Sequence, residues 1–200
     1  MNAGELRWQA DVLELLEIEP NEFAWRQKIR IWVKVEHQTA RSIFSNNTIM
    51  QRTVKLMIRA FPELSLYNAL LLLSDAGEHC FLTDINKDAP GVYLLTAVIV
   101  EPVKCKAERT TTGKGALNRP EVTKHQPLIF PGVLTEKYLR QTQEEPMSVS
   151  EAQYVLVTPK AISLDIGELV YINNLPYEIV IPHILDQYKN EYEVLRRSDN

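Results

Sequence analysis

Alternation of apolar and polar residues is the feature that most constrains how this chain folds. From Lys28 to Glu36, isoleucine and valine occupy every second position, between charged or aromatic residues. Successive side chains of an extended chain point to opposite faces, so a period of two predicts a half-buried β-strand. Further strand-like runs are bounded by turn residues, as in small all-β domains. The most distinct are TVKLMIR at 53–59, HCFLTDI at 79–85, VYLLTAVIVEPV at 92–103 and QYVLVTP at 153–159.

The order of runs and turns occurs twice in the chain. Residues 64–82 read LSLYNALLLLSDAGEHCFL, and residues 164–180 read LDIGELVYINNLPYEIV. In each, a short polar turn separates two apolar runs, and a strand-like run precedes the whole. We interpret this as a duplicated unit of roughly 70 to 80 residues, folding each time as a small antiparallel barrel of the SH3-like or OB-like kind. The alternative is that two unrelated small antiparallel barrels share such a pattern.

The N-terminal segment has a different spacing. Apolar residues between Ala3 and Ile18 fall near helical intervals, and Pro20 with Asn21 ends the pattern, which predicts a short helix. The predicted fold class is therefore mainly β with one short N-terminal helix. The predicted parts are this helix at 1–21, a first barrel-like domain at 22–105, a basic extended loop or linker at 106–126, and a second barrel-like domain at 127–200.

A polar stretch at 104–126 concentrates positive charge in a chain whose net charge is −4. It has few apolar residues, and a connecting loop of this length is usually functional or disordered. We expect it to face a partner or DNA, through Lys104, Lys106, Arg109, Lys114, Arg119 and Lys124. A second polar segment at 140–151 is predicted to be another interaction loop. Its candidate residues are Arg140, Gln143, Glu144 and Glu145.

Charge and composition exclude several classes of protein. The balance of 22 basic and 26 acidic residues argues against broad nucleic-acid binding, which requires a basic surface. Neither a signal peptide nor an apolar run of about 18 residues occurs, so no membrane span is expected. The two cysteines, Cys80 and Cys105, are not expected to form a disulfide, which fits a reducing compartment.

The sequence contains no catalytic or metal-binding motif, and we predict no enzymatic activity, no cofactor and no metal site. TTTGKG at 110–115 lacks both the glycine and the hydroxyl residue that a Walker phosphate loop requires. The four histidines lack metal-ligand spacing. Carboxylates at strand ends and turns, such as Asp165 and Glu168, are expected to cap or to be solvated.

The polar face of the first alternating strand is open to two interpretations. Its residues are Lys28, Arg30, Trp32 and Lys34. They would bind single-stranded nucleic acid if the domain formed an OB-like surface. Tryptophan and arginine are also enriched where subunits meet, so the same face fits a subunit contact equally well.

The second half of the chain carries a family-like pattern. GVLTEKYLRQTQ at 132–143 precedes AQYVLVTPK at 152–160, LDIGELVYINNLPYEIV at 164–180 and a final YEVLRR at 192–197. This order resembles the head-closure and head–tail joining proteins of tailed bacteriophages, whose small barrel often carries a long loop, a strand and (L/I)xxGDxVxxxGxxYxV. The equivalent places are held by Leu164, Gly167, Glu168, Val170, Tyr177 and Val180, with Asn173 and Asn174 replacing the usual turn glycine. The first half is similar more loosely, through IFS at 43–45, TVKLMIR and GEHCFLTDI.

The resemblance implies a non-catalytic structural protein of the virion, assembled in the host bacterial cytoplasm. Such proteins form rings with their own copies in the neck, between the portal or adaptor and the tail, and the genome passes through the bore. A basic loop facing that bore would meet DNA through its phosphates, without reading sequence. Tail-completion proteins and components of tail-like particles have similar barrels and are alternatives. A small-barrel module that binds nucleic acid or peptide is a further alternative.

Overall fold

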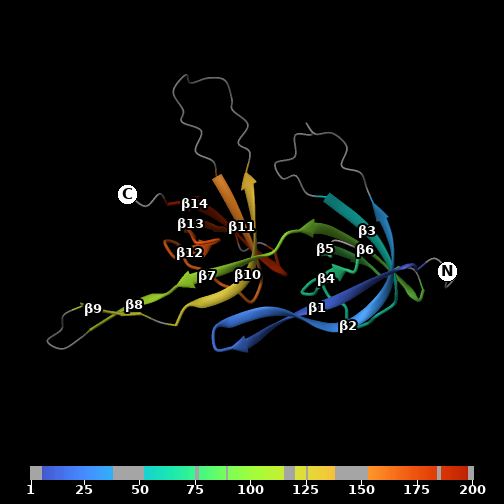
Figure 1. Ribbon diagram of the computed structural model, residues 1–200, viewed down its shortest axis with the longest axis horizontal. Helices are drawn as coiled ribbons and strands as arrows, with labels where there is room; N and C mark the ends of the chain where they lie inside the picture. The colour runs from blue at the N-terminus through green and yellow to red at the C-terminus, as the bar shows by residue number, and fades with distance from the viewer. Residues whose placement is uncertain are drawn as a thin grey trace, which may run out of the picture. The chain divides into compact units, whose positions relative to one another are not determined.

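The computed structural model describes residues 6–37, 52–74, 77–88, 90–114, 120–124, 126–137, 153–183 and 186–197. Every regular element in these ranges is a β-strand, and none is a helix (Figure 1). The prediction of a mainly β fold is therefore confirmed.

The predicted N-terminal helix is wrong over the described residues. β1 (Trp8–Glu19) is a strand that pairs antiparallel with β4 (Ala69–Leu72) and also pairs with β2 (Glu22–His37). The apolar residues of this short segment fit both helical and strand spacing, because leucine or isoleucine alternates with glutamate toward its end. Pairing on both edges favours the strand, since it satisfies the backbone polar groups around the fully buried Ala10 and Val12.

The chain divides into two compact units. The first comprises Met1–Leu16 and Trp25–Pro102, and the second comprises Glu17–Ala24 and Val103–Asn200. The other strands of the first unit are β3 (Arg52–Arg59), β5 (Glu78–Asn86) and β6 (Val92–Val100).

Strand pairing in the first unit returns to its starting point. The order is β1-β4-β5-β6-β3-β2, and β2 also pairs with β1, so six strands form a ring. Alternate side chains point inward, as the period of two requires. Val33, Leu56, Leu70 and Leu82 belong to the resulting core and are at most 2% exposed.

The second unit has a similar succession of paired strands. The order is β10-β11-β14-β13-β12-β7, and β7 also pairs with β10. Phe130, Leu156 and Ile179 are fully buried in its core. The turn between β1 and β2 is part of this unit, where the Ile129 N–H donates to the Asn21 carbonyl at 2.8 Å. The strands are β7 (Val103–Glu108), β10 (Leu128–Lys137), β11 (Gln153–Pro159), β12 (Leu169–Ile172), β13 (Leu175–His183) and β14 (Lys189–Arg196).

The two units share one pairing order. When β1 to β6 are matched in sequence with β7 and β10 to β14, every strand has equivalent neighbours. The fifth strand of each set carries a register shift at the same place, between Leu82 and Asp84 in β5 and between Ile179 and Ile181 in β13. One backbone plan is therefore built twice from different side chains.

The predicted linker at 106–126 differs from the structure along its described part. β7 is a strand with partners on both edges, and it alternates exposed lysines with the fully buried Cys105 and Ala107. Because the buried residues of this strand are small and lie between charged residues, its sequence shows no clear apolar alternation. Beyond Arg109, β8 (Thr110–Lys114) and β9 (Pro120–Lys124) pair with each other in a separate two-stranded sheet.

A substitution at Gly132 tests how tightly the second unit is packed. An added Cβ atom there would lie 2.9 Å from Cys105 Sγ and 2.9 Å from Leu156 Cδ1. We expect Gly132→Ala to lower the free energy of unfolding by about 1–3 kcal/mol through overpacking, measured by urea denaturation. Adding Cys105→Ala removes one clashing atom, so the double variant should be less destabilised than the sum of the single changes. Strict additivity would contradict this explanation.

Candidate functional site

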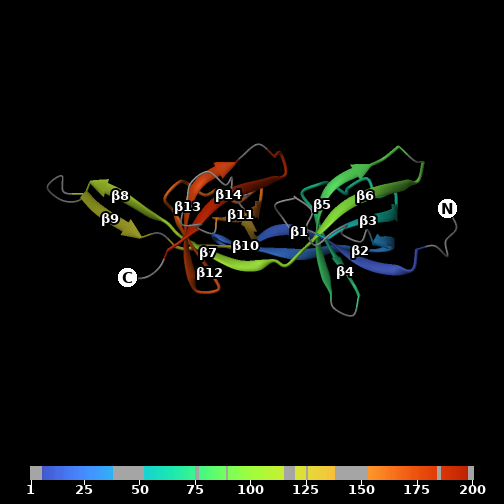
Figure 2. The same cartoon turned by 90° about the horizontal axis from the view of Figure 1, so that it is seen from above.

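The two strands β8 and β9 form an arm that leaves the second unit between β7 and β10. Their register runs from Thr110 opposite Lys124 to Lys114 opposite Pro120. Figures 1 and 2 show the pair extending beyond the other strands of this unit. Neither strand has a further strand partner among the described residues. Because an isolated two-stranded hairpin is marginally stable in water, this arm is a candidate for binding a partner.

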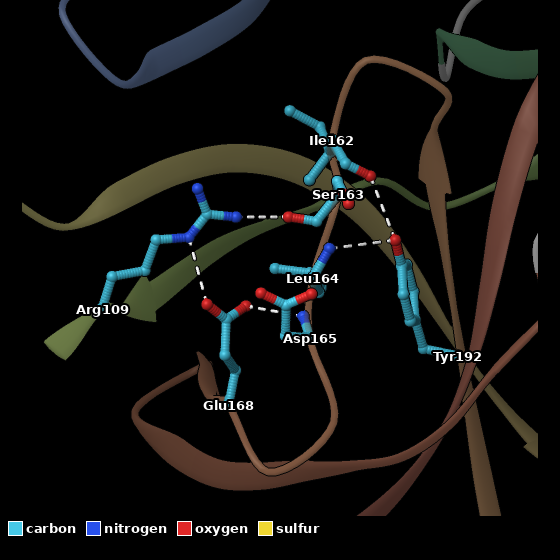
Figure 3. Close-up of polar contacts among 7 residues, drawn as sticks. All are labelled: Arg109, Ile162, Ser163, Leu164, Asp165, Glu168 and Tyr192. Atoms are coloured by element: carbon cyan, nitrogen blue, oxygen red, sulfur yellow. Dashed lines mark hydrogen bonds and ion pairs between the residues drawn. The ribbon is translucent and has the colours of Figure 1, made fainter. Parts of the chain in front are cut away.

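The base of the β8–β9 arm is held by Arg109, the residue between β7 and β8. Its Nε atom donates to Glu168 Oε1 at 3.1 Å, and a second guanidinium nitrogen donates to the Ser163 carbonyl (Figure 3). The other carboxylate oxygen of Glu168 accepts from the Asp165 N–H at 3.0 Å. The Glu168 side chain is only 16% exposed, so this charge-assisted pair is shielded from water on one side.

Tyr192 holds the same loop from the core side. Its hydroxyl donates to the Ile162 carbonyl at 3.1 Å and accepts from the Leu164 N–H at 3.1 Å (Figure 3). Asn190 Nδ2 also donates to the Ile162 carbonyl, at 2.8 Å. Burial raises the pKa of the fully buried Tyr192, which favours the neutral hydroxyl that this donor role requires. Contacts therefore run without a break from the core to the base of the arm.

The corresponding loop of the first unit shows what is specific to this arrangement. The Ser65 N–H donates to Asn68 Oδ1 at 3.0 Å, as the Asp165 N–H does to Glu168. Asn68 Nδ2 then donates to the Leu13 carbonyl of β1 at 3.2 Å. A carboxylate cannot make that second bond, because it has no N–H to donate. In the second unit, Glu168 instead accepts a hydrogen bond from Arg109, at the base of the β8–β9 arm.

Five of the six predicted basic residues lie in the described ranges, and they form two groups. Lys104 Nζ lies 3.3 Å from Glu22 Oε1, and Lys106 Nζ lies 3.1 Å from Glu108 Oε1. Together with Arg109, these residues are paired with carboxylates of the same chain. Lys114 and Lys124 lie in the strands of the arm. The remaining predicted residues lie outside the described ranges: Arg119 and, in the second loop, Arg140, Gln143, Glu144 and Glu145.

The polar face of β2 is lined by internal ion pairs. The Arg30 guanidinium donates to both oxygens of Asp11, at 2.7 and 3.1 Å, and Asp11 is 5% exposed. Lys28 Nζ lies 3.3 Å from a Glu63 carboxylate oxygen. Cations already facing carboxylates bind phosphates less strongly, so this pairing weighs against a nucleic-acid platform on this face. Trp32, on the same strand, is 54% exposed.

Other candidate chemistry is sparse in the part of the chain that the structure describes. No cluster of three or more histidine, cysteine or acidic side chains there is arranged to hold a metal ion. Cys80 and Cys105 are free and buried, and burial raises the pKa of each thiol to about 12. In the same ranges no helix is long and apolar enough to cross a membrane.

Sequence reasoning found part of this site. Glu168 was expected either to cap a turn or to be solvated, and its carboxylate accepts a hydrogen bond from the Asp165 N–H. The roles of Tyr192 and Asp11 were missed, because their partners lie 28 and 19 residues away along the chain. Other polar residues occur in both strands, so Asp11 and Tyr192 do not stand out in the sequence. Comparison with protein-family models, curated proteins and solved structures found no match.

The ion pair at the base of the arm can be tested by a charge swap. Arg109→Glu should increase amide hydrogen exchange of the β8–β9 arm several-fold, because a carboxylate at position 109 would repel that of Glu168. Combining it with Glu168→Arg should recover part of the protection. Lys106→Glu, a matched charge reversal on β7, should leave exchange in the arm unchanged. Equal loosening by both single variants would contradict a specific role for Arg109.

The Tyr192 hydroxyl is tested by its removal. We expect Tyr192→Phe to lower the free energy of unfolding by about 1–3 kcal/mol, because the buried Leu164 N–H loses its acceptor. Tyr171→Phe is the control, because Tyr171 is half-buried and its change should stay within about 0.5 kcal/mol. Thermal or urea unfolding measures both. A neutral Tyr192→Phe would show that the loop is held by other contacts.

Proposed function

We propose that this protein is a structural assembly component that forms a ring with its own copies in the neck of a tailed-phage virion. It would close the head or join head and tail, between the portal or adaptor and the tail. The observation that carries the proposal is the β8–β9 arm, a hairpin with unpaired edges in the described structure, fixed at its base by Arg109 and Glu168. Tail completion, or a place in a tail-like particle, would use the same features.

The proposal includes the finer architecture. Each unit would be a small SH3-like or OB-like barrel, and the two would derive from duplication of one ancestral unit. The shared pairing order and the register shift at the same step of β5 and β13 support this. The matched caps, Ser65 with Asn68 and Asp165 with Glu168, support it at the level of single hydrogen bonds. Two barrels of independent origin could share the pairing order, but they are less expected to share the same side-chain hydrogen bond at the equivalent loop.

Strand edges explain why the arm is suited to assembly. A closed barrel pairs both edges of its strands and offers none to another chain. The outer edges of β8 and β9 are different, because they present backbone groups that no described strand pairs. An extended segment of a neighbouring subunit can add there as a further strand. Lys114 and Lys124, in the strands of the arm, would also permit sequence-independent contact with the phosphates of a genome in the bore.

Replacement of the arm tests this function. In the full chain, we expect ring-sized oligomers by mass photometry, and a variant with a Gly-Ser turn in place of residues 110–124 should remain monomeric. Its urea unfolding midpoint should match that of the full chain, since β8 and β9 pair with no other described strand. A second control, Lys114→Gln with Lys124→Gln, separates charge from strand addition and should still assemble.

Two results would contradict the assembly function. One is a full chain that stays monomeric at all concentrations, alone and with portal, adaptor and tail-tube proteins. The other is oligomers that persist unchanged without the arm. Strong DNA binding that weakens steeply with salt, and that Lys28→Gln with Lys34→Gln abolishes, would instead support the binding-module alternative.

A further inference from the structure

The two units differ at one equivalent loop position. In the first unit, Leu66 is half-buried and packs against the core. In the second unit, the same place in the loop is held by Ile166, which is 70% exposed. An isoleucine held so far into water by a structured turn has no role in the core of its own unit. The exposure of Ile166 therefore needs an explanation other than packing in that core.

Two further apolar residues lie beside Ile166. The Gly167 N–H donates to the Ile179 carbonyl at 2.9 Å, and the Ile179 N–H donates to the Glu168 carbonyl at 3.0 Å. These bonds place the loop against the register shift of β13, where Val180 and Ile181 are each 44% exposed. At the matched shift in β5, the exposed residues are Thr83 and Asp84. We name Ile166, Val180 and Ile181 the apolar knob of the second unit.

The loop that carries Ile166 of the knob is held by hydrogen bonds to two other parts of the unit. Arg109 holds it through Glu168 and Ser163, and Tyr192 holds it through Ile162 and Leu164. A side chain presented by an ordered loop loses little conformational entropy when it binds. The knob is therefore prepared for contact with a complementary surface.

The first unit offers an apolar groove. The pairing of β2 with β3 ends at Val33, opposite Ile58. Ile31 and Trp32 lie in β2 beyond this point, so β3 does not pair with the edge beside them. The groove has a volume of about 530 Å³. It is lined by Leu6, Ile31, Trp32, Arg59, Ala60 and Phe61. Its exposed tryptophan and its rim arginine are residue types that dominate the energy of protein interfaces.

Charge at the two surfaces is complementary. Asp165 precedes the knob and is exposed, and Arg59 is exposed at the groove. Within the described residues neither side chain has an ion-pair partner, in contrast to Lys28, Arg30 and Arg109. An aspartate beside an apolar knob and an arginine beside an apolar groove can pair as the knob enters.

We propose that the apolar knob of one copy of this chain docks in the groove of the next copy, with Asp165 facing Arg59. The occupant is a second copy because both complementary surfaces occur on one chain, and because the first unit has the packed Leu66 where the second unit exposes Ile166. Two different surfaces that meet head to tail generate a closed ring when the rotation per subunit closes. This interface rests on the proposed ring-forming function and names the contact by which the ring closes.

Cysteine cross-linking tests this contact in the full-length chain. An equimolar mixture of the single variants Ile166→Cys and Trp32→Cys should form a covalent dimer under mild oxidation. Cys80 and Cys105 should not compete, because both are buried and their thiol pKa is raised to about 12. Leu94→Cys mixed with Trp32→Cys is the matched control, because Leu94, like Ile166, is an exposed aliphatic residue. The control mixture should give at least tenfold less dimer.

Charge reversal tests the same contact without cysteines. Asp165→Arg and Arg59→Asp should each weaken self-association tenfold or more by mass photometry, and the double variant should recover most of it. Ile166→Asp should also weaken it, whereas Leu94→Asp should not. Unfolding curves that match the unsubstituted chain show that each variant is folded.

Each outcome decides between the alternatives. No dimer from the Ile166→Cys and Trp32→Cys mixture, in a chain that still forms rings through its arm, overturns this interface and leaves the proposed function standing. In a chain that carries both Ile166→Cys and Trp32→Cys, a disulfide found only within monomers also overturns it, because the contact would be intramolecular. A chain that neither assembles nor cross-links overturns both proposals.

Discussion

Strand pairing on both edges is the constraint on which the rest of this structure depends. In each unit, the succession of paired strands returns to its first member, so buried backbone N–H and C=O groups find partners within the unit. The core can then be filled by alternate residues of short strands, without a helix to cover an open face. β8 and β9 belong to neither succession of strands, so no described strand pairs with their outer edges.

Within this common backbone plan, the two units differ at a few positions, and those differences bear on function. The Asn68 amide accepts a hydrogen bond within its loop and donates another to β1. The Glu168 carboxylate can only accept hydrogen bonds, and it accepts one from Arg109. Leu95 pairs with Leu56 in the same way that Tyr192 pairs with Leu156, but only the tyrosine adds a hydroxyl that binds the neighbouring loop. The second unit thus gains a loop that is held by Arg109, at the base of the arm, and by Tyr192, and that exposes Ile166.

Most strands were predictable because their burial follows a period of two that is visible in the sequence. The exceptions share a physical cause. β1 carries leucines and glutamates that suit two periods, and pairing with distant strands favours one of them. β7 buries only Cys105 and Ala107, which are too small to mark a core strand by composition. Side chains such as Asp11 and Tyr192 find their partners across a sheet, and separation along the chain hides such pairs.

By itself, the sequence determined that this chain is mainly β, that its pattern of runs and turns occurs twice, and that its positive charge gathers before β10. These properties follow from local alternation and composition, which each residue carries with it. The tertiary structure alone decided that Lys104, Lys106 and Arg109 face carboxylates of the same chain, and that Ile166 is exposed while Leu66 is packed. Burial and pairing depend on which distant strands become neighbours, and that information is a property of the closed sheet, not of any single segment.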